Sequence, residues 1–192
     1  DAYTTYDYGY DAFTNSLANA TTTTTQDLTG SSPVKIVVTY FDTNFNVIMI
    51  KELVDQAASP IVINTTNITY NDTVSLNPYL PTLVVAPNLT TTSSTYNTRG
   101  NLASSTDALS NVTLWTYAED GPIPDPNPKH WNLVIKLQRP TVTVNGVPTN
   151  YTPELWGYDT NGNLLTYTDA LSHNTVYTRN ADGTVATVTD VN

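Results

Sequence analysis

The chain has 192 residues, of which 39% are hydrophobic and only 12% are charged, and its formal net charge is -10 at pH 7. Its 7 Lys and Arg side chains are too few and too scattered for a phosphate-binding surface, which argues against a nucleic-acid partner. The absence of cysteine excludes a disulfide scaffold and a thiolate metal site, and the lack of an 18-residue apolar run argues against a membrane span.

Residues 1–32 differ in composition from the rest of the chain. Tyr6, Tyr8 and Tyr10 alternate as they would on one face of a strand, and the Thr-rich stretch that follows predicts an extended linker. The strand pairs either with its own sheet or with a neighbouring subunit by strand addition. In the second case the contact residues are Tyr3, Tyr6, Tyr8, Tyr10 and Phe13. Because the chain begins at Asp1 without Met, we interpret it as a processed form.

The remaining sequence predicts antiparallel β-hairpins with almost no helix. Residues 33–121 form a β domain or the first half of a sandwich, residues 122–130 form a proline-rich loop and boundary, and residues 131–192 form the second β domain or half. A single helical turn is expected at most, either near 53–58 or in a D-A-L-S stretch. We therefore expect an all-β fold of one antiparallel sandwich or two, and an Asn145-Gly146 hairpin turn.

A sequence repeat links two distant segments. When 96–121 is laid on 158–183, 14 of 26 positions are identical, with the shared pattern Y-x-T-x-G-N-L-x-x-x-T-D-A-L-S. These segments resemble the YD-repeat (Rhs-repeat) family, most closely over 158–190, with weaker echoes at 41–47 and 10–17. The resemblance implies β-hairpins stacked into spiralling sheets of cell-surface or secreted proteins, and it brings no active site. The wide spacing of the copies disfavours a closed, toxin-enclosing shell.

The repeat residues themselves predict tight turns rather than a catalytic or metal site. Asn161-Gly162 suits a two-residue type I′ turn, and the Asp159 carboxylate is expected to accept backbone N–H groups there. The D-x-N-x-N pattern from Asp159 has the oxygen spacing of a cation loop, but Leu164 replaces the glycine that such a loop needs, so no metal is predicted.

Histidine chemistry is not expected either. His173 is replaced by Asn111 in the sister copy, which points to a structural position, and His130 stands alone in the proline-rich loop. With only three Glu residues and no catalytic cluster, we predict that the chain is not an enzyme and needs no cofactor.

Glycosylation acceptor sequences are numerous. The pattern N-x-[ST] predicts N-glycans at several positions, which would shield a weakly charged surface. The acceptor residues are Asn19, Asn64, Asn67, Asn71, Asn88, Asn111 and Asn150. The run 21–25 is a weaker candidate for O-glycans.

Together these features predict a glycosylated structural subunit of an extracellular filament or surface layer. Copies of the chain would join head to tail by β-strand donation into a homopolymer. The alternative is a cell-surface adhesin or carbohydrate-binding module of a larger YD-repeat protein, with its site formed by the loop 119–130 and Trp115.

Overall fold

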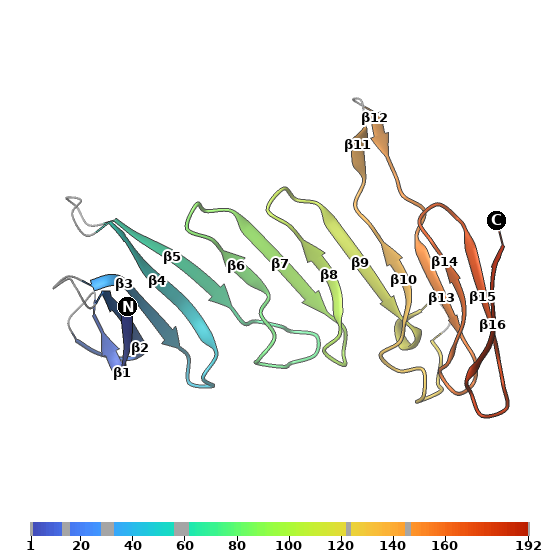
Figure 1. The fold of residues 1–192 in the computed structure, drawn as a ribbon, viewed down its shortest axis with the longest axis horizontal. Helices are drawn as coiled ribbons and strands as arrows, with labels where there is room; N and C mark the ends of the chain where they lie inside the picture. The colour runs from blue at the N-terminus through green and yellow to red at the C-terminus, as the bar shows by residue number, and fades with distance from the viewer. Residues whose placement is uncertain are drawn as a thin grey trace. The chain divides into compact units, whose positions relative to one another are not determined.

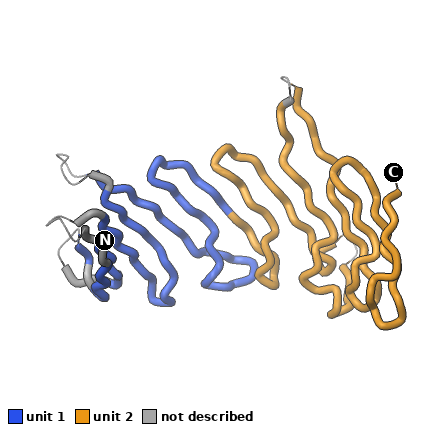
Figure 2. The backbone as a smooth tube through the Cα atoms, viewed as in Figure 1, with its two compact units in different colours: residues 1–93 blue, residues 94–192 orange. Residues whose placement is uncertain are grey.

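The fold is described from a computed structural model, in which residues 2–12, 16–27, 33–55, 62–121, 124–144 and 147–191 are described. It divides into two compact units, residues 1–93 (unit 1) and 94–192 (unit 2), with the division inside strand β7 (Figure 2). The proline-rich segment predicted as a boundary lies within unit 2. Across the described ranges the only helix is the 3-10 turn η1 (Ala118–Asp120).

The strands form consecutive antiparallel hairpins (Figure 1). Unit 1 contains β1 (Ala2–Asp11), β2 (Ser16–Asp27), β3 (Pro33–Phe41), β4 (Val47–Asp55), β5 (Val62–Thr69), β6 (Leu83–Val85) and the start of β7 (Thr91–Tyr96). Unit 2 continues with β8 (Leu102–Thr106), β9 (Val112–Tyr117), β10 (Val134–Gln138), β11 (Val142–Val144), β12 (Val147–Thr149), β13 (Glu154–Tyr158), β14 (Leu164–Thr168), β15 (Asn174–Arg179) and β16 (Val185–Val191).

Of the strands in the described part of the chain, fourteen share one sheet in chain order. Strands β11 and β12 form a separate ribbon that extends beyond β10 and β13 in Figure 1. The prediction of an all-β antiparallel fold is confirmed. The strands follow one another as a row of hairpins in one large sheet, whereas a sandwich would have two facing sheets. In the ribbon Val144 lies opposite Val147, as a hairpin requires, and the predicted Asn145-Gly146 turn lies outside the described residues.

Little of the sheet is covered by other elements. The buried apolar side chains among the described residues are Ala20, Val38, Tyr96, Tyr117 and Ala118. Much of the Thr-rich surface of the strands therefore faces water, which suits its hydroxyl groups.

The first three strands contain the core of unit 1. Val38 of β3 and Thr22 of β2 lie opposite each other and are 0% and 1% exposed. The Tyr40 hydroxyl donates a hydrogen bond to the buried Asp11 carboxylate, and burial together with this carboxylate raises the pKa of Tyr40. The Thr-rich stretch predicted as a linker is thus strand β2, because Thr is β-branched and fits a pleated strand paired on both sides.

Seven hairpin turns among the described residues share one geometry. In each, the N–H of the first residue donates to the carbonyl of the fifth, and the N–H of the fourth donates to the carbonyl of the first. The fourth residue has a positive φ, which identifies a type I turn followed by a G1 bulge. The turns begin at Asp42, Ala86, Asn97, Asp107, Asp159, Asp169 and Asn180.

The turn at Asp159 differs from the predicted type I′ turn, because only Gly162 takes a positive φ. The cause is the Asp159 side chain, whose Oδ1 accepts the backbone N–H groups of Asn161 and Asn163 at 2.8 and 2.9 Å. The predicted capping role of Asp159 is confirmed, and Asp42, Asp107 and Asp169 make the same pair of bonds in their own turns.

The two sequence copies are also structurally equivalent where their residues differ. The Tyr117 hydroxyl donates to the carbonyl of Leu102 at 3.0 Å, and 62 residues later the Arg179 guanidinium donates to the carbonyl of Leu164 at 2.7 Å. Two different side chains therefore satisfy the same backbone acceptor in the two copies, which a comparison of residue identities does not reveal.

Candidate functional site

The segment between β9 and β10 binds the first turn of each repeat copy within unit 2. We call residues 118–121 and 124–133 the bridging segment. Toward the turn that begins at Asn97, the Asn97 amide donates to the Asp120 carboxylate at 2.6 Å, and the Arg99 guanidinium lies 3.7 Å from the Trp131 ring centre. This geometry is a cation–π contact, and it orders the Trp131 ring at the edge of the segment.

The same segment reaches the equivalent turn of the second copy. The amide of Asn127 donates to the carbonyl of Thr160 at 2.9 Å, and the Lys129 ammonium donates to Asn161 Oδ1 at 2.7 Å. Gly162 belongs to this contact as well, because a Cβ at this position would lie 2.8 Å from the Lys129 carbonyl oxygen.

His130 is the central residue of the second contact. Its Nδ1–H donates to the Asp125 carboxylate and its Nε2–H to the carbonyl of Asp159, and the side chain is buried. Both bonds are made only by the protonated ring, and the bond to Asp125 is the main reason that the pKa of His130 is raised. The bridging segment therefore acts as a structural element that joins the two repeat turns.

Described residues of the loop predicted as an alternative carbohydrate site take part in internal bonds. Glu119 accepts the backbone N–H of Asn132 at 3.0 Å, and the carboxylate is largely buried. Trp115 lies in β9, where it pairs across the sheet with Leu137, and it does not belong to the bridging segment. Glu119 therefore belongs to the internal contacts of the bridging segment, and Trp115 belongs to the sheet.

The N-terminal strand lies in its own sheet. β1 pairs with β2 along its length, so the first of the two predicted pairings is the one present in this chain. Tyr6 and Tyr8 are 60% and 80% exposed on one face of β1. The backbones of Tyr3 and Tyr10 belong to the same strand, and Phe13 lies outside the described residues.

The seven acceptor asparagines lie at the surface in both units. Six are exposed, and Asn111 is half-buried. Asn64 and Asn67 lie in β5 at an odd spacing, so they occupy opposite faces of the sheet. The Thr run proposed for O-glycans lies in β2, where Thr22 is buried.

The side-chain amides of these asparagines differ in how they are used. Asn19 Nδ2 donates to two backbone carbonyls, those of Phe41 at 2.7 Å and Asp42 at 3.1 Å. Asn111 Nδ2 donates to the Asp107 carboxylate at 2.8 Å. Asn88 instead uses its Oδ1, which accepts the Thr90 N–H and hydroxyl at 3.2 and 2.7 Å.

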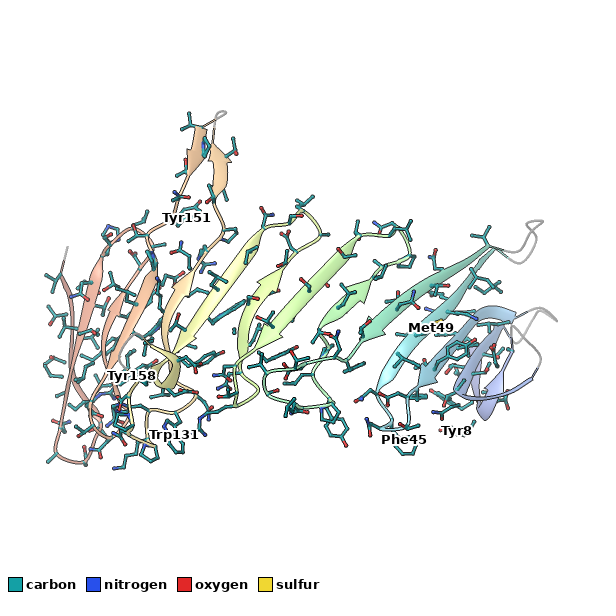
Figure 3. All side chains as sticks on the ribbon, turned by 180° about the vertical axis from the view of Figure 1, so that it is seen from behind. Tyr8, Phe45, Met49, Trp131, Tyr151 and Tyr158 are labelled. Atoms are coloured by element: carbon teal, nitrogen blue, oxygen red, sulfur yellow. The ribbon has the colours of Figure 1, made fainter. Side chains whose placement is uncertain are left out.

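Among the cavities that described residues line are two at the surface, one in each unit. The larger, of about 590 Å³, lies in unit 2 between the start of β9, the end of β10 and the base of the β11–β12 ribbon, where Figure 3 labels Tyr151. The smaller, of about 300 Å³, lies in unit 1 beside the exposed rings of Tyr8 and Phe45, which are adjacent in Figure 3. No sequence pattern indicates either cavity, because each is formed by loops and strand ends that are distant in the chain.

Among the residues that the structure describes, no three His, Asp or Glu side chains are placed to hold a metal ion. Over the same residues, no helix has the length and apolar character needed to cross a membrane.

Comparison with known proteins finds no matching family model and no matching curated protein. Among solved structures, the crystal structures of TcdB2-TccC3-Cdc42 and TcdB2-TccC3-TEV align with 97% of this chain at 10% identity, with TM-scores of 0.37 and 0.36. The structure of the Photorhabdus luminescens Tc holotoxin pore aligns at 11% identity with a TM-score of 0.26. The chain spans 12% of the length of the first two chains and 14% of the third. The function proposed below rests on this chain's own residues.

Proposed function

We propose that the chain is a non-catalytic structural subunit of an extracellular assembly, in which the β1 edge of one copy pairs with the β16 edge of the next. The observation that carries the proposal is that, within the described residues, β1 pairs only with β2 and β16 pairs only with β15. An edge strand with unpaired N–H and C=O groups is a template for a further strand. A contact between two different edges does not close on itself, so it propagates as a filament.

The side chains of both edge strands support this pairing. All seven residues of β16 are exposed, including Val188 at 57%. In β1, Tyr6 and Tyr8 lie on one face and are available to pack against an added strand. Because β1 is already held by β2, we propose that it acts as an edge of a finished sheet rather than as a detached donor.

We expect lysine substitutions on either edge to stop assembly. The doubles Tyr6→Lys/Tyr8→Lys in β1 and Ala186→Lys/Val188→Lys in β16 place charges on one face of each edge strand, which natural proteins use to prevent edge pairing. Electron microscopy and sedimentation of the wild-type chain should show filaments, whereas each variant alone should stay monomeric.

A mixture of the two variants provides the sharpest test, because one intact edge remains on each. The mixture should give dimers and nothing longer. The matched control is Val147→Lys/Thr149→Lys in the β12 ribbon, where both residues are exposed, and it should assemble like the wild type. Filaments formed by both edge variants, or a wild-type chain that stays monomeric, would contradict the proposal.

We further propose that the assembly is N-glycosylated, which would keep a weakly charged sheet soluble outside the cell. The support is the exposure of the acceptor asparagines, including Asn64 and Asn67 on opposite faces of β5. Sugar at these two positions would cover both faces of the sheet and leave its edges open for pairing.

We expect site occupancy to follow the use of each Nδ2 atom. A glycan replaces one hydrogen of Nδ2. Asn19 should therefore be the least occupied site, because its Nδ2 donates two hydrogen bonds, and Asn111 should follow, because its Nδ2 donates one. Asn88 uses its Oδ1 as the acceptor and should carry sugar. Glycopeptide mass spectrometry of the native protein measures this order, and full occupancy at Asn19 would overturn it.

A further inference from the structure

The larger cavity in unit 2 has the lining of a site for a polyhydroxylated ligand. Its volume of about 590 Å³ falls within the roughly 300–1,000 Å³ of ligand pockets. Its lining includes the amide side chains of Asn111, Gln138 and Asn150, the hydroxyl of Thr141 and the ring of Tyr151. Amides both donate and accept hydrogen bonds, as sugar hydroxyl groups do.

The one cationic side chain in the lining is already neutralised. Arg139 Nε and Nη2 lie 2.7 and 2.6 Å from Glu154 Oε1, and Glu154 is only 7% exposed. The other carboxylate oxygen accepts the Tyr167 hydroxyl at 2.8 Å, which raises the pKa of Tyr167. An anionic ligand would have to compete with this buried carboxylate for Arg139, so the charge balance favours a neutral ligand.

Hydrogen bonds hold the lining side chains in position and leave some of their polar atoms available to a ligand. Gln138 Nε2 donates to the carbonyls of Arg139 and Tyr151 at 3.2 and 3.1 Å, which fixes the amide and leaves its Oε1 as an acceptor. Asn150 Oδ1 accepts the Thr141 hydroxyl, and no bond between described residues uses the Asn150 Nδ2. The site is therefore pre-organised, which reduces the entropy cost of binding.

We propose that this cavity binds a neutral saccharide, with a sugar ring against Tyr151 and a hydroxyl group on Gln138 Oε1; a saccharide that is not attached to the chain also bonds to Asn150 Nδ2. The saccharide has two sources, a glycan attached to the chain at Asn150 or a separate glycan on a neighbouring molecule. The attached source rests on the glycosylation proposed above, and the separate source does not.

The first arm of the test uses protein made in a host without N-glycosylation. It is titrated with chitobiose, cellobiose and mannobiose while amide NMR shifts are recorded. At least one disaccharide should shift the signals of Gln138, Asn150 and Tyr151, with a Kd of about 1 mM. The variants Tyr151→Ala and Gln138→Ala should each raise this Kd about tenfold or more, whereas Tyr79→Ala, which alters an exposed tyrosine of unit 1, should not change it. Absence of shifts for every disaccharide, or binding that survives both substitutions, would overturn the proposal.

The second arm uses the glycoprotein and its Thr152→Ala variant, which removes the acceptor sequence but keeps Asn150. If the attached glycan is the source, the glycoprotein should reject the free disaccharide and Thr152→Ala should bind it. If the source is separate, both should bind. An unmodified Asn150 would rule out the attached source and leave the result of the first arm in force, so failure of glycosylation and failure of the cavity are distinguishable.

Discussion

Replacement of Gly162 by alanine should destabilise unit 2 by about 2–3 kcal/mol. Gly162 has a φ of +85°, a conformation that costs a residue with a Cβ about 1–2 kcal/mol. The new Cβ would also lie 2.8 Å from the Lys129 carbonyl oxygen, which is backbone and has to move with the bridging segment. The loss should therefore exceed the cost of backbone conformation alone.

Gly183 provides the matched control. It occupies the same turn position with a φ of +86°, and the nearest atom to an added Cβ is Asn163 Nδ2 at 3.9 Å. Gly183→Ala should cost only the conformational term, about 1 kcal/mol. Urea unfolding of the two variants measures the difference, and equal losses would show that the bridging segment is not packed against the turn at Asp159.

The local structure of the repeat was predictable because its causes lie within a few residues. The D-x-N-G-N pattern contains both the capping carboxylate and the glycine of the turn, so the sequence predicts a hairpin there. The turn type was wrong because two central residues with positive φ were expected, and a cap on the N–H groups of Asn161 and Asn163 instead selects a type I turn with a bulge at Gly162.

The role of the proline-rich segment was not predictable in the same way. Prolines and exposed polar residues between two strands are typical of a linker, and they suggested a boundary. The contacts of Asn127, Lys129 and His130 are made with backbone and side chains about 30 residues later, and such partners leave no periodic pattern. The larger cavity escaped prediction for the same reason.

The Thr-rich stretch shows how composition can mislead. A Thr-rich stretch with few apolar residues suggested an extended linker. In the fold the run of threonines at 21–25 is paired on both sides, and Thr22 is buried opposite Val38 while the other four threonines are half-buried. Strand formation there depends on the neighbours β1 and β3, so it could not be inferred from the run alone.

Stability should fall on both sides of a pH plateau, because two kinds of group are shifted in opposite directions. In the turns, bonds to the carboxylates lower the pKa values of Asp42, Asp107, Asp159 and Asp169 below 3.8. The bonds from Asn46, Asn111 and Asn163 side chains are the largest cause at the first three, and the backbone N–H of His173 is the largest at the fourth. A lowered folded pKa stabilises the fold above the unfolded value of about 3.8, and the stabilisation is lost as pH falls through the folded pKa.

His130 acts in the opposite sense. Its folded pKa is raised above 6.5, so its contribution is complete below about pH 6.5 and is lost as pH rises through the folded pKa. Because these two pH windows lie at opposite ends of the range, the unfolding temperature measured between about pH 2 and about pH 10 should decline at both ends. His130→Gln should flatten the alkaline decline and leave the acid one.

The substitution Asp159→Asn should reduce the loss of stability at acid pH, because an asparagine already makes the equivalent turn in the first copy. Asn97 occupies the equivalent position in the first copy, and its Oδ1 accepts the N–H groups of Arg99 and Asn101 at 3.0 and 2.9 Å. Asparagine can therefore make the turn without titrating, at the loss of the bond from Asn163 Nδ2. If the double variant Asp159→Asn/Asp107→Asn lost stability at acid pH as steeply as the wild type, the turn carboxylates would not be the cause of that loss.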